Sequence, residues 1–134
     1  MLQKLQTKGR GGFTLVEIMI VVAIIALLAA IAVPNFLRAR KRSQATRILE
    51  DLRMLDAAVD QYAIETNKQT GFGAGLADVK NYLKVGTTLY TSGADMFGNA
   101  YGPTFTVDSV PKVPTSAYNV LSDVAGPEFW SPYR

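Results

Sequence analysis

The chain has 134 residues, enough for one domain of ordinary size, and it contains neither cysteine nor histidine. These absences exclude disulfides and thiol chemistry and remove the commonest general base and metal ligand, which argues against an enzyme and against a bound cofactor. The formal charge is +3, but the first twelve residues carry three basic side chains and no acid, and the rest carries eleven of each sign. The excess charge therefore belongs to an N-terminal leader and does not indicate nucleic-acid binding, which needs a basic surface on the folded domain.

An unbroken apolar segment follows this leader. Ile18 to Val33 are sixteen consecutive apolar residues, and the uncharged run extends to Leu37. A helix of about 20 such residues spans a hydrocarbon core of ~30 Å, so residues 13–37 are predicted to form a transmembrane helix. A buried core helix and a secretory signal peptide are the alternatives. Against the second, the small residues Gly11 and Gly12 precede the apolar run, whereas a signal peptide places its cleavage site after that run.

One acid lies inside this segment. Glu17 follows Gly12 by five residues, and a carboxylate within a membrane is costly unless it has a partner. Cleavage after Gly12 would give Phe13 a free cationic amine one helical turn from Glu17, or would offer that amine to a neighbouring copy. The alternative is that Glu17 lies at headgroup level and is solvated.

The sequence Gly12-Phe13-Thr14-Leu15-Val16-Glu17, continued by the apolar run to Pro34, resembles the N-terminus of type IV prepilins and type II secretion pseudopilins. The resemblance implies cleavage after Gly12 by a membrane prepilin peptidase and N-methylation of Phe13. It also implies packing of this helix in a filament core, with assembly roles for Glu17 and Pro34, and polymerisation by an inner-membrane assembly platform.

Basic residues gather beyond the apolar segment, at Arg38, Arg40, Lys41 and Arg42. The positive-inside rule alone would place the C-terminal part in the cytoplasm, whereas the resemblance places it outside. This cluster is predicted to contact lipid headgroups, to contact acids of the next subunit, or simply to be solvated.

An amphipathic helix is predicted over residues 38–66, after a kink or local opening at Pro34. Its apolar stripe has helical spacing and should pack on the C-terminal part of the same chain. The stripe consists of Ile48, Leu52, Leu55, Val59, Tyr62 and Thr66.

The remaining residues, 67–134, are predicted to form a small globular head. Gly71, Gly73 and Gly75 should break the long helix, and a short antiparallel sheet is expected from strands at Leu89–Tyr90 and Thr104–Val110. A turn is predicted at Gly98-Asn99 and short helices at Asp78–Leu83 and Ser116–Val124.

The segment Asp95-Met96-Phe97-Gly98-Asn99-Ala100-Tyr101 resembles a loop of the major type II secretion pseudopilins. The glycine- and aspartate-rich calcium segment of those proteins is not evident after it. Asp108 and Asp123 are isolated acids, so they are expected to be solvated and no metal site is predicted.

The periodicity and the strand signals predict an α+β chain in which an apolar helix continues as an amphipathic helix that packs on a small antiparallel sheet. The resemblance implies that this fold is pilin-like, with a protruding apolar helix and a cleaved leader at residues 1–12. The predicted function is that of a structural subunit of a type IV pilus or type II secretion pseudopilus. Its expected partners are other copies of the chain, the prepilin peptidase, the assembly platform and membrane lipid. Nucleic acid is not expected as a partner. The precursor would lie in the bacterial inner membrane and the polymer in the periplasm or at the cell surface. The alternative is a single-pass membrane protein with a ligand-binding ectodomain that does not polymerise.

Overall fold

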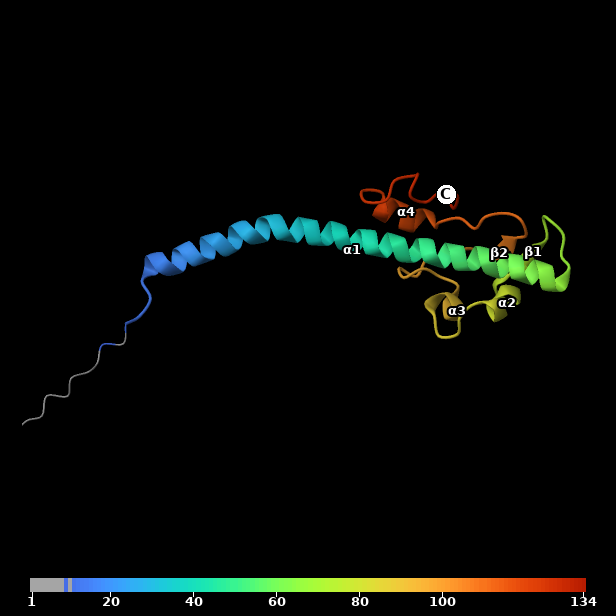
Figure 1. Ribbon diagram of the computed structural model, residues 1–134, viewed down its shortest axis with the longest axis horizontal. Helices are drawn as coiled ribbons and strands as arrows, with labels where there is room; N and C mark the ends of the chain where they lie inside the picture. Colours follow the sequence, from blue (N-terminus) through green and yellow to red (C-terminus); the bar gives the residue numbers. More distant parts are fainter. Residues whose placement is uncertain (1–8, 10) are drawn as a thin grey trace, which may run out of the picture. The chain divides into compact units, whose positions relative to one another are not determined.

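A computed structural model of the chain describes Gly9 and residues 11–134 (Figure 1). The leader predicted at residues 1–12 lies mostly outside the described residues, and so do its basic side chains at Lys4, Lys8 and Arg10. The chain divides into two compact units, one ending at Leu37 and the other running from Arg38 to Arg134. Each unit is described by itself.

The first long element is helix α1, Leu15–Thr66, which contributes to both units. The run from Ile18 to Val33 consists of Ala, Leu, Met, Ile and Val, and neither glycine nor a polar residue interrupts it. The helical conformation continues through Pro34, so the proline does not end the helix.

Asn67, rather than the glycines that follow, ends α1. Its φ of 51° places it in the left-handed conformation, and the Lys68 backbone N–H donates to the Ala63 carbonyl oxygen at 2.9 Å. This is the Schellman arrangement, which satisfies the last carbonyls of a helix and uses Asn where glycine is commoner. The prediction that the helix breaks at Gly71, Gly73 and Gly75 was therefore wrong in its cause, although the helix does end at Thr66.

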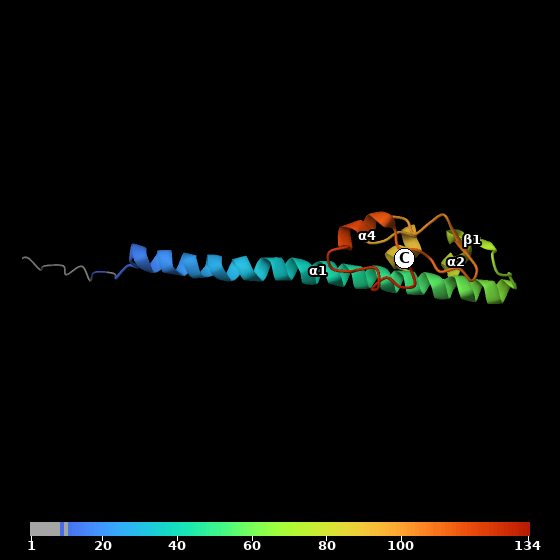
Figure 2. The ribbon, with the colours of Figure 1, turned by 90° about the horizontal axis from the view of Figure 1, so that it is seen from above.

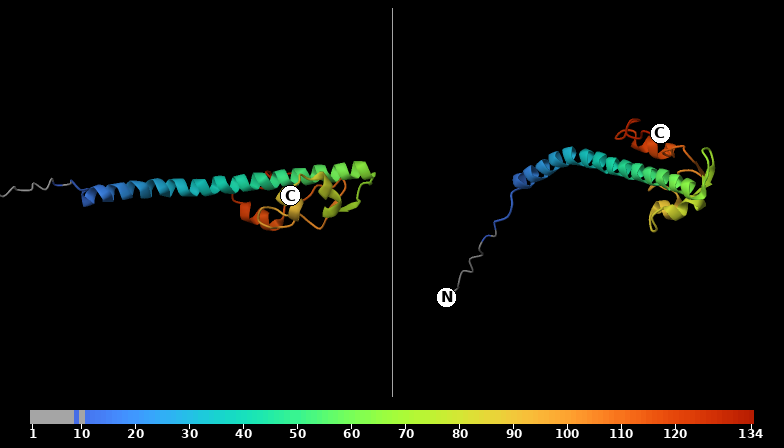
Figure 3. Two further views of the ribbon diagram at one scale, coloured as in Figure 1. Left: turned by 90° about the horizontal axis from the view of Figure 1, so that it is seen from below. Right: turned by 45° about the vertical axis from the view of Figure 1, so that its right-hand side comes forward.

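In the second unit, the short elements lie along one side of the C-terminal part of α1 (Figure 2). Helix α4, Thr115–Leu121, lies on one flank of α1, and α2, Leu76–Val79, and α3, Thr88–Ser92, lie on the other (Figure 1). The two further views in Figure 3 show the same arrangement. The head thus covers one face of the helix and leaves the opposite face to solvent or to a partner.

The sheet is small and antiparallel, as the sequence predicts, but its strands differ from the predicted ones. Strand β1 is Gly73–Gly75 and pairs with β2, Thr104–Thr106, with Ala74 opposite Phe105. The predicted second strand, Thr104 to Val110, is shorter because the chain turns at Asp108, where φ is 62°. Glycine weakens strand propensity, so β1 carried no strand signal of its own. Tertiary contact with β2 decides its conformation.

The predicted strand at Leu89–Tyr90 is a helix. These residues lie in α3, where the Thr87 side chain accepts a hydrogen bond from the Tyr90 N–H at 3.1 Å and so caps the first turn. Gly93 ends α3 in the left-handed conformation, and a side chain at Gly93 would collide with Leu76. Capping therefore overrides the β-propensity of a single tyrosine here.

Two predicted helices are present with changed bounds. The helix predicted at Asp78–Leu83 is divided into α2 and the 3-10 helix η1, Lys80–Tyr82. The helix predicted at Ser116–Val124 is α4, which ends at Leu121. The predicted turn at Gly98-Asn99 is confirmed: Gly98 has φ of 85° and its N–H donates to the Asp95 carbonyl, between the bridged residues Ala94 and Ala100.

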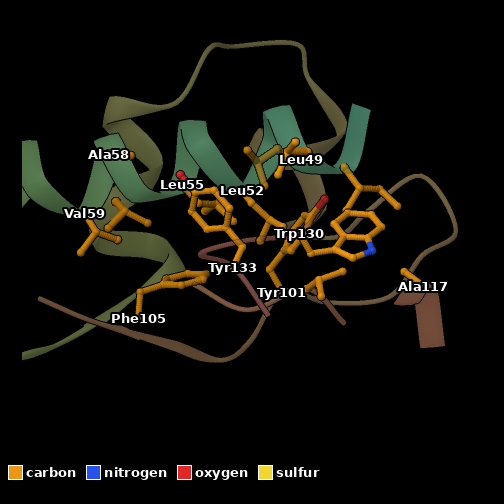
Figure 4. Packing of buried hydrophobic residues seen from close by; sticks show 14 of the residues in the cluster. Leu49, Leu52, Leu55, Ala58, Val59, Tyr101, Phe105, Ala117, Trp130 and Tyr133 are labelled. Atoms are coloured by element: carbon orange, nitrogen blue, oxygen red, sulfur yellow. The ribbon is translucent and has the colours of Figure 1, made fainter. Parts of the chain in front are cut away.

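The apolar stripe of α1 forms the centre of the core, as predicted (Figure 4). Ile48, Leu52 and Leu55 are fully buried, whereas Tyr62 is half-buried and Thr66 is exposed. The sequence analysis did not single out Trp130, which is also fully buried and donates its Nε1–H to the Ala125 carbonyl at 3.2 Å. A buried indole needs such a partner, so this hydrogen bond fixes the C-terminal segment on the head.

Candidate processing and assembly site

The predicted cleavage position lies in an exposed stretch before α1. Gly12 and Phe13 precede the helix, and the Phe13 side chain is 85% exposed. A Cβ built on Gly12 would meet no atom within 4 Å. The described chain therefore imposes no packing requirement for glycine at this position.

Thr14 and Glu17 form a reciprocal pair at the start of α1. The Thr14 N–H donates to Glu17 Oε2 at 2.7 Å, and the Glu17 N–H donates to Thr14 Oγ1 at 3.2 Å. This is a capping box, in which two of the unsatisfied N–H groups of a helix start are each bonded to a side chain. The sequence signal was available as Thr-x-x-Glu and was missed. In the uncleaved chain Glu17 thus has a partner in Thr14, not in a Phe13 amine.

The apolar part of α1 exposes its side chains on every side. From Leu15 to Leu37 no described residue is buried, and Phe36 is 67% exposed. The helix is long and apolar enough to cross a membrane by length and composition. Water is a poor environment for so large an apolar surface, so lipid or other protein must cover it.

The basic cluster after Leu37 is only partly paired within the chain. Lys41 Nζ lies 2.9 Å from Asp123 Oδ2, and this hydrogen bond holds the pKa of Asp123 below its usual value, with a smaller contribution from Arg38. The expectation that Asp123 is isolated was therefore wrong, although its side chain is exposed as expected. Asp108 is not isolated either, because it accepts a hydrogen bond from the Thr70 hydroxyl. Neither contact could be predicted from the sequence, because the paired residues lie 82 and 38 positions apart.

Three carboxylates of α1 bind tyrosine hydroxyls of the head. The Tyr101 hydroxyl donates to Asp51 at 3.1 Å, the Tyr133 hydroxyl to Asp56 at 3.4 Å, and the Tyr82 hydroxyl to Glu65 at 2.7 Å. These three contacts are spaced along α1, so they fix the head at several points on the helix. No pattern in the sequence pointed to them, since each joins residues at least seventeen positions apart.

Burial dominates the electrostatics of this interface. It raises the pKa of Asp51 above its usual value, although the hydrogen bond from Tyr101 and the charge of Arg47 act in the opposite direction. Burial also raises the pKa of Asp56, with a further increase from the charge of Asp60. The pKa of Tyr101 is raised strongly, first by burial and then by the Asp51 charge.

The loop that resembles a pseudopilin loop is organised by one buried carboxylate. Asp95 is 1% exposed and accepts hydrogen bonds from the N–H groups of Phe97 and Asn99, both at 2.8 Å, and from the Asn99 side chain. A buried carboxylate is tolerated only when it is bonded in this way. The loop then leads directly to Tyr101, so it positions the hydroxyl that binds Asp51.

The described residues show no constellation for metal binding. Within Gly9 and residues 11–134, no three Asp or Glu side chains converge on a common point. One open surface hollow of about 560 Å³ is lined by Asp60, Asn67, Lys68 and Asp108 together with apolar residues. It contains no nucleophile and base pair of the kind that catalysis needs.

Comparison with known proteins agrees with the resemblance seen at the N-terminus. Residues 7–33 match the family model described as the prokaryotic N-terminal methylation motif. The chain is 33% identical over 120 residues to fimbrial protein Q of Moraxella bovis, and the matched segment covers 88% of this chain and 76% of that protein. No solved structure matches the chain.

Two further relatives match about half of the chain. The major component PilA4 of the type IV wide pilus of Thermus thermophilus is 45% identical over 69 residues, and the type II secretion system core protein G of Aeromonas hydrophila is 30% identical over 77 residues. The matched segments cover 52% and 58% of this chain and span about half the length of those relatives, 53% and 54%. With the longer match to the fimbrial protein, these findings show that the chain belongs to the family of type IV pilins and type II secretion pseudopilins.

Proposed function

We propose that the chain is a structural subunit of a helical filament, processed at its N-terminus and polymerised through the apolar part of α1. The observation that carries the proposal is that every residue from Leu15 to Leu37 is exposed in a member of a filament-forming family. In the precursor, membrane lipid covers this surface. In the polymer, the same surface is covered by copies of the same helix.

The chemistry of the N-terminus supports a defined processing step. Cleavage after Gly12 by a prepilin peptidase leaves Phe13 with a free α-amine, which is then N-methylated. Cleavage also leaves the Thr14–Glu17 capping box intact, because both of its residues lie in the mature chain. Glu17 is therefore the carboxylate closest in sequence to the new Phe13 amine when assembly begins.

Glu17 gives the polymer a preferred axial register. A carboxylate that leaves the headgroup level for a helix bundle is unfavourable unless it meets a cation. The Phe13 amine of a neighbouring subunit supplies that cation when the two helices are correctly staggered. Because the two helices are displaced along the axis, the amine of one subunit meets the carboxylate of the next without a reciprocal contact, so the contact is heterologous and generates an open helical fibre.

Pro34 and the head complete the proposed subunit. Pro34 cannot donate a backbone hydrogen bond, so it marks the place where α1 can adjust its packing in the polymer. The head covers one face of α1 beyond Arg38 and leaves the other face available for neighbouring copies (Figure 2). An inner-membrane assembly platform would extract the precursor from the bilayer and dock it.

The proposal is tested by producing the full chain in a bacterial host that has a prepilin peptidase and an assembly machine. Mass spectrometry of the membrane fraction should show a mature chain beginning at Phe13 and carrying one added methyl group. Electron microscopy of sheared material should show filaments that contain this chain. A chain that keeps Met1, remains in the membrane and forms no filaments would instead support a membrane-anchored protein that does not polymerise.

A further inference from the structure

The charges of α1 in the second unit fall into two blocks. In the basic block, residues 38–47, every charged side chain is positive: Arg38, Arg40, Lys41, Arg42 and Arg47. The acidic block, residues 50–65, holds five carboxylates and one arginine: Glu50, Asp51, Arg53, Asp56, Asp60 and Glu65. Opposite charges that stabilise a helix by pairing within it usually lie three or four residues apart. Segregation over several turns suits contact with something outside the helix.

Several of these charges are already bound inside the chain. Lys41 pairs with Asp123, and the tyrosine contacts described above hold Asp51, Asp56 and Glu65. Within residues 11–134, the structure gives no other ion pair, so Arg38, Arg40 and Arg42 have no carboxylate within 4.0 Å.

Glu50 and Asp60 are the corresponding carboxylates on the acidic side. Both are exposed, and in the part of the chain that the structure describes neither takes part in a side-chain hydrogen bond or an ion pair. The helix therefore presents exposed, unmatched charges of both signs. Within one copy, Arg42 lies eight residues before Glu50, more than two helical turns away, so Arg38, Arg40 and Arg42 cannot reach these two carboxylates along the same helix.

Two parallel copies can match them by sliding along each other. With a rise of ~1.5 Å per residue, Glu50 lies ~12 Å and Asp60 ~27 Å further along the helix than Arg42. An axial offset within this range places the basic block of one copy beside the acidic block of the next. Arg40 and Arg42 project to nearly opposite sides of the helix, since two residues turn it by ~200°, so the basic block can reach neighbours on both flanks.

We propose that, in the filament, the basic block of one subunit docks on Glu50 and Asp60 of a neighbouring copy of the same chain. This inference rests on the proposed polymerisation and adds a second electrostatic contact, outside the membrane-spanning segment, that selects the axial offset. Contact with lipid headgroups would use the same arginines, but it gives no role to Glu50 and Asp60. The presence of unmatched charges of both signs therefore favours a second copy over lipid.

Charge reversal within one chain gives a direct test. Arg40→Glu with Arg42→Glu makes the basic block repel the acidic block of its neighbours, and Glu50→Arg with Asp60→Arg does the same from the other side. Each double variant should lose roughly tenfold or more of its sheared filament, because juxtaposed like charges are costly. The quadruple variant restores opposite charges between every pair of copies and should recover filaments.

Matched controls separate this effect from general changes in charge. Lys84→Glu and Glu128→Arg alter exposed charges of the head that have no ion-pair partner among the described residues, and both should assemble normally. Membrane insertion and cleavage after Gly12 are measured for every variant, because arginines near a membrane segment also affect orientation. Variants that are inserted and processed like wild type are compared for assembly.

Cysteine pairs provide a second measurement that does not depend on reversed charges. The natural chain has no cysteine, so a disulfide ladder in filaments of Arg42→Cys/Glu50→Cys or Arg42→Cys/Asp60→Cys reports contact between these two blocks of different copies. We expect at least one pair to give the ladder and Lys84→Cys/Glu128→Cys to give none.

Three outcomes are decisive. Normal filaments from the Glu50→Arg/Asp60→Arg variant, with loss only from the arginine variant, would assign the basic block to lipid and overturn the inference. Failure of the quadruple variant to recover while inserted and processed, together with no ladder from either pair, would also overturn it. Absence of filaments from the wild-type chain would instead contradict the proposed function.

Discussion

The Tyr101 hydroxyl donates a hydrogen bond to Asp51 Oδ2 at 3.1 Å, across fifty residues of sequence. Tyr101 is 8% exposed and follows directly on the loop organised by Asp95. The loop that resembles a pseudopilin segment thus has a structural role here, because it delivers a buried hydroxyl to a carboxylate of α1. This contact and the two other tyrosine contacts join the head to the helix that carries it into a filament.

Replacing Tyr101 by phenylalanine should weaken the head. Tyr101→Phe removes the donor and leaves the half-buried Asp51 without this partner, so the free energy of unfolding should fall by about 1 kcal/mol or somewhat more. Denaturant unfolding of purified protein measures it. Tyr90→Phe is the matched control, because no hydrogen bond to the Tyr90 hydroxyl is found among the described residues, and the ring would still face the Lys80 amine at 4.6 Å. Equal effects from the two variants would contradict a specific role for the Tyr101 hydroxyl.

The head should lose stability in alkaline solution. Burial, and then the Asp51 charge, raise the pKa of Tyr101 in the folded chain, while an unfolded tyrosine ionises near pH 10. Above that pH the unfolded chain releases a proton that the folded chain keeps, so the free energy of unfolding falls as pH rises. The contribution is fully present below about pH 10. Burial raises the pKa of Tyr133 in the same direction.

Unfolding measured from pH 8 to 11 tests this dependence. The decline should be shallower in Tyr101→Phe than in wild type, because the variant lacks one of the groups that titrates differently in the two states. Tyr90→Phe again serves as the control, and its profile should follow that of wild type. Parallel profiles for all three proteins would show that Tyr101 ionises with a similar pKa in the folded and unfolded chains.

Processing should depend on Gly12. Gly12→Val adds a branched side chain to the exposed stretch beside the membrane, where the peptidase must bind an extended backbone. Because a Cβ at Gly12 meets nothing in the chain itself, the fold should be unaffected. The uncleaved chain of 134 residues should accumulate in the membrane without filaments. Gly11→Val is the neighbouring control, and normal cleavage of Gly12→Val would show that the cleavage site lies elsewhere.

Two substitutions of Glu17 separate its capping role from its charge. Glu17→Gln can still accept the hydrogen bond from the Thr14 N–H, because glutamine also completes a capping box, but it cannot pair with an amine as an ion. If the charge sets the filament register, both Glu17→Gln and Glu17→Val should insert in the membrane and fail to assemble. Sheared filament is quantified for each.

Thr14→Val provides the complementary change. It removes the hydroxyl that accepts the Glu17 N–H and keeps the carboxylate, so it should cost helix stability at the N-terminus without abolishing assembly. Abundant filaments from Glu17→Gln together with loss from Thr14→Val would assign Glu17 to capping instead of subunit pairing.

The head should fold without the apolar segment and without calcium. A truncated chain beginning at Gln44 keeps the buried residues of α1, and each fully buried side chain such as Ile48, Leu52 or Leu55 contributes roughly 1.5–3 kcal/mol. That is substantial beside a net stability of ~5–15 kcal/mol, so a soluble folded monomer is expected. Its melting temperature should be the same with calcium and with a chelator. A drop of many degrees on chelation would reveal a calcium site formed by acids that the described structure keeps apart.

The sequence by itself determined the features that depend on local chemistry. The apolar run from Ile18 to Val33, the position of Glu17 and the stripe Ile48 to Val59 follow from hydropathy and period, which need no distant contact. These features are enough for the α+β fold class and the family. The capping box of Thr14 and Glu17 was equally local and could have been predicted from the Thr-x-x-Glu pattern.

Only the tertiary structure decided the rest of the head. Its segments are short, so local propensity is weak and distant partners settle the conformation: Gly73–Gly75 is a strand because β2 lies beside it, and Leu89–Tyr90 is helical because Thr87 caps that turn. The contacts of Asp51 with Tyr101 and of Lys41 with Asp123 span fifty and eighty-two residues. No periodicity encodes such pairs, because they form only when the folded core brings their backbones together.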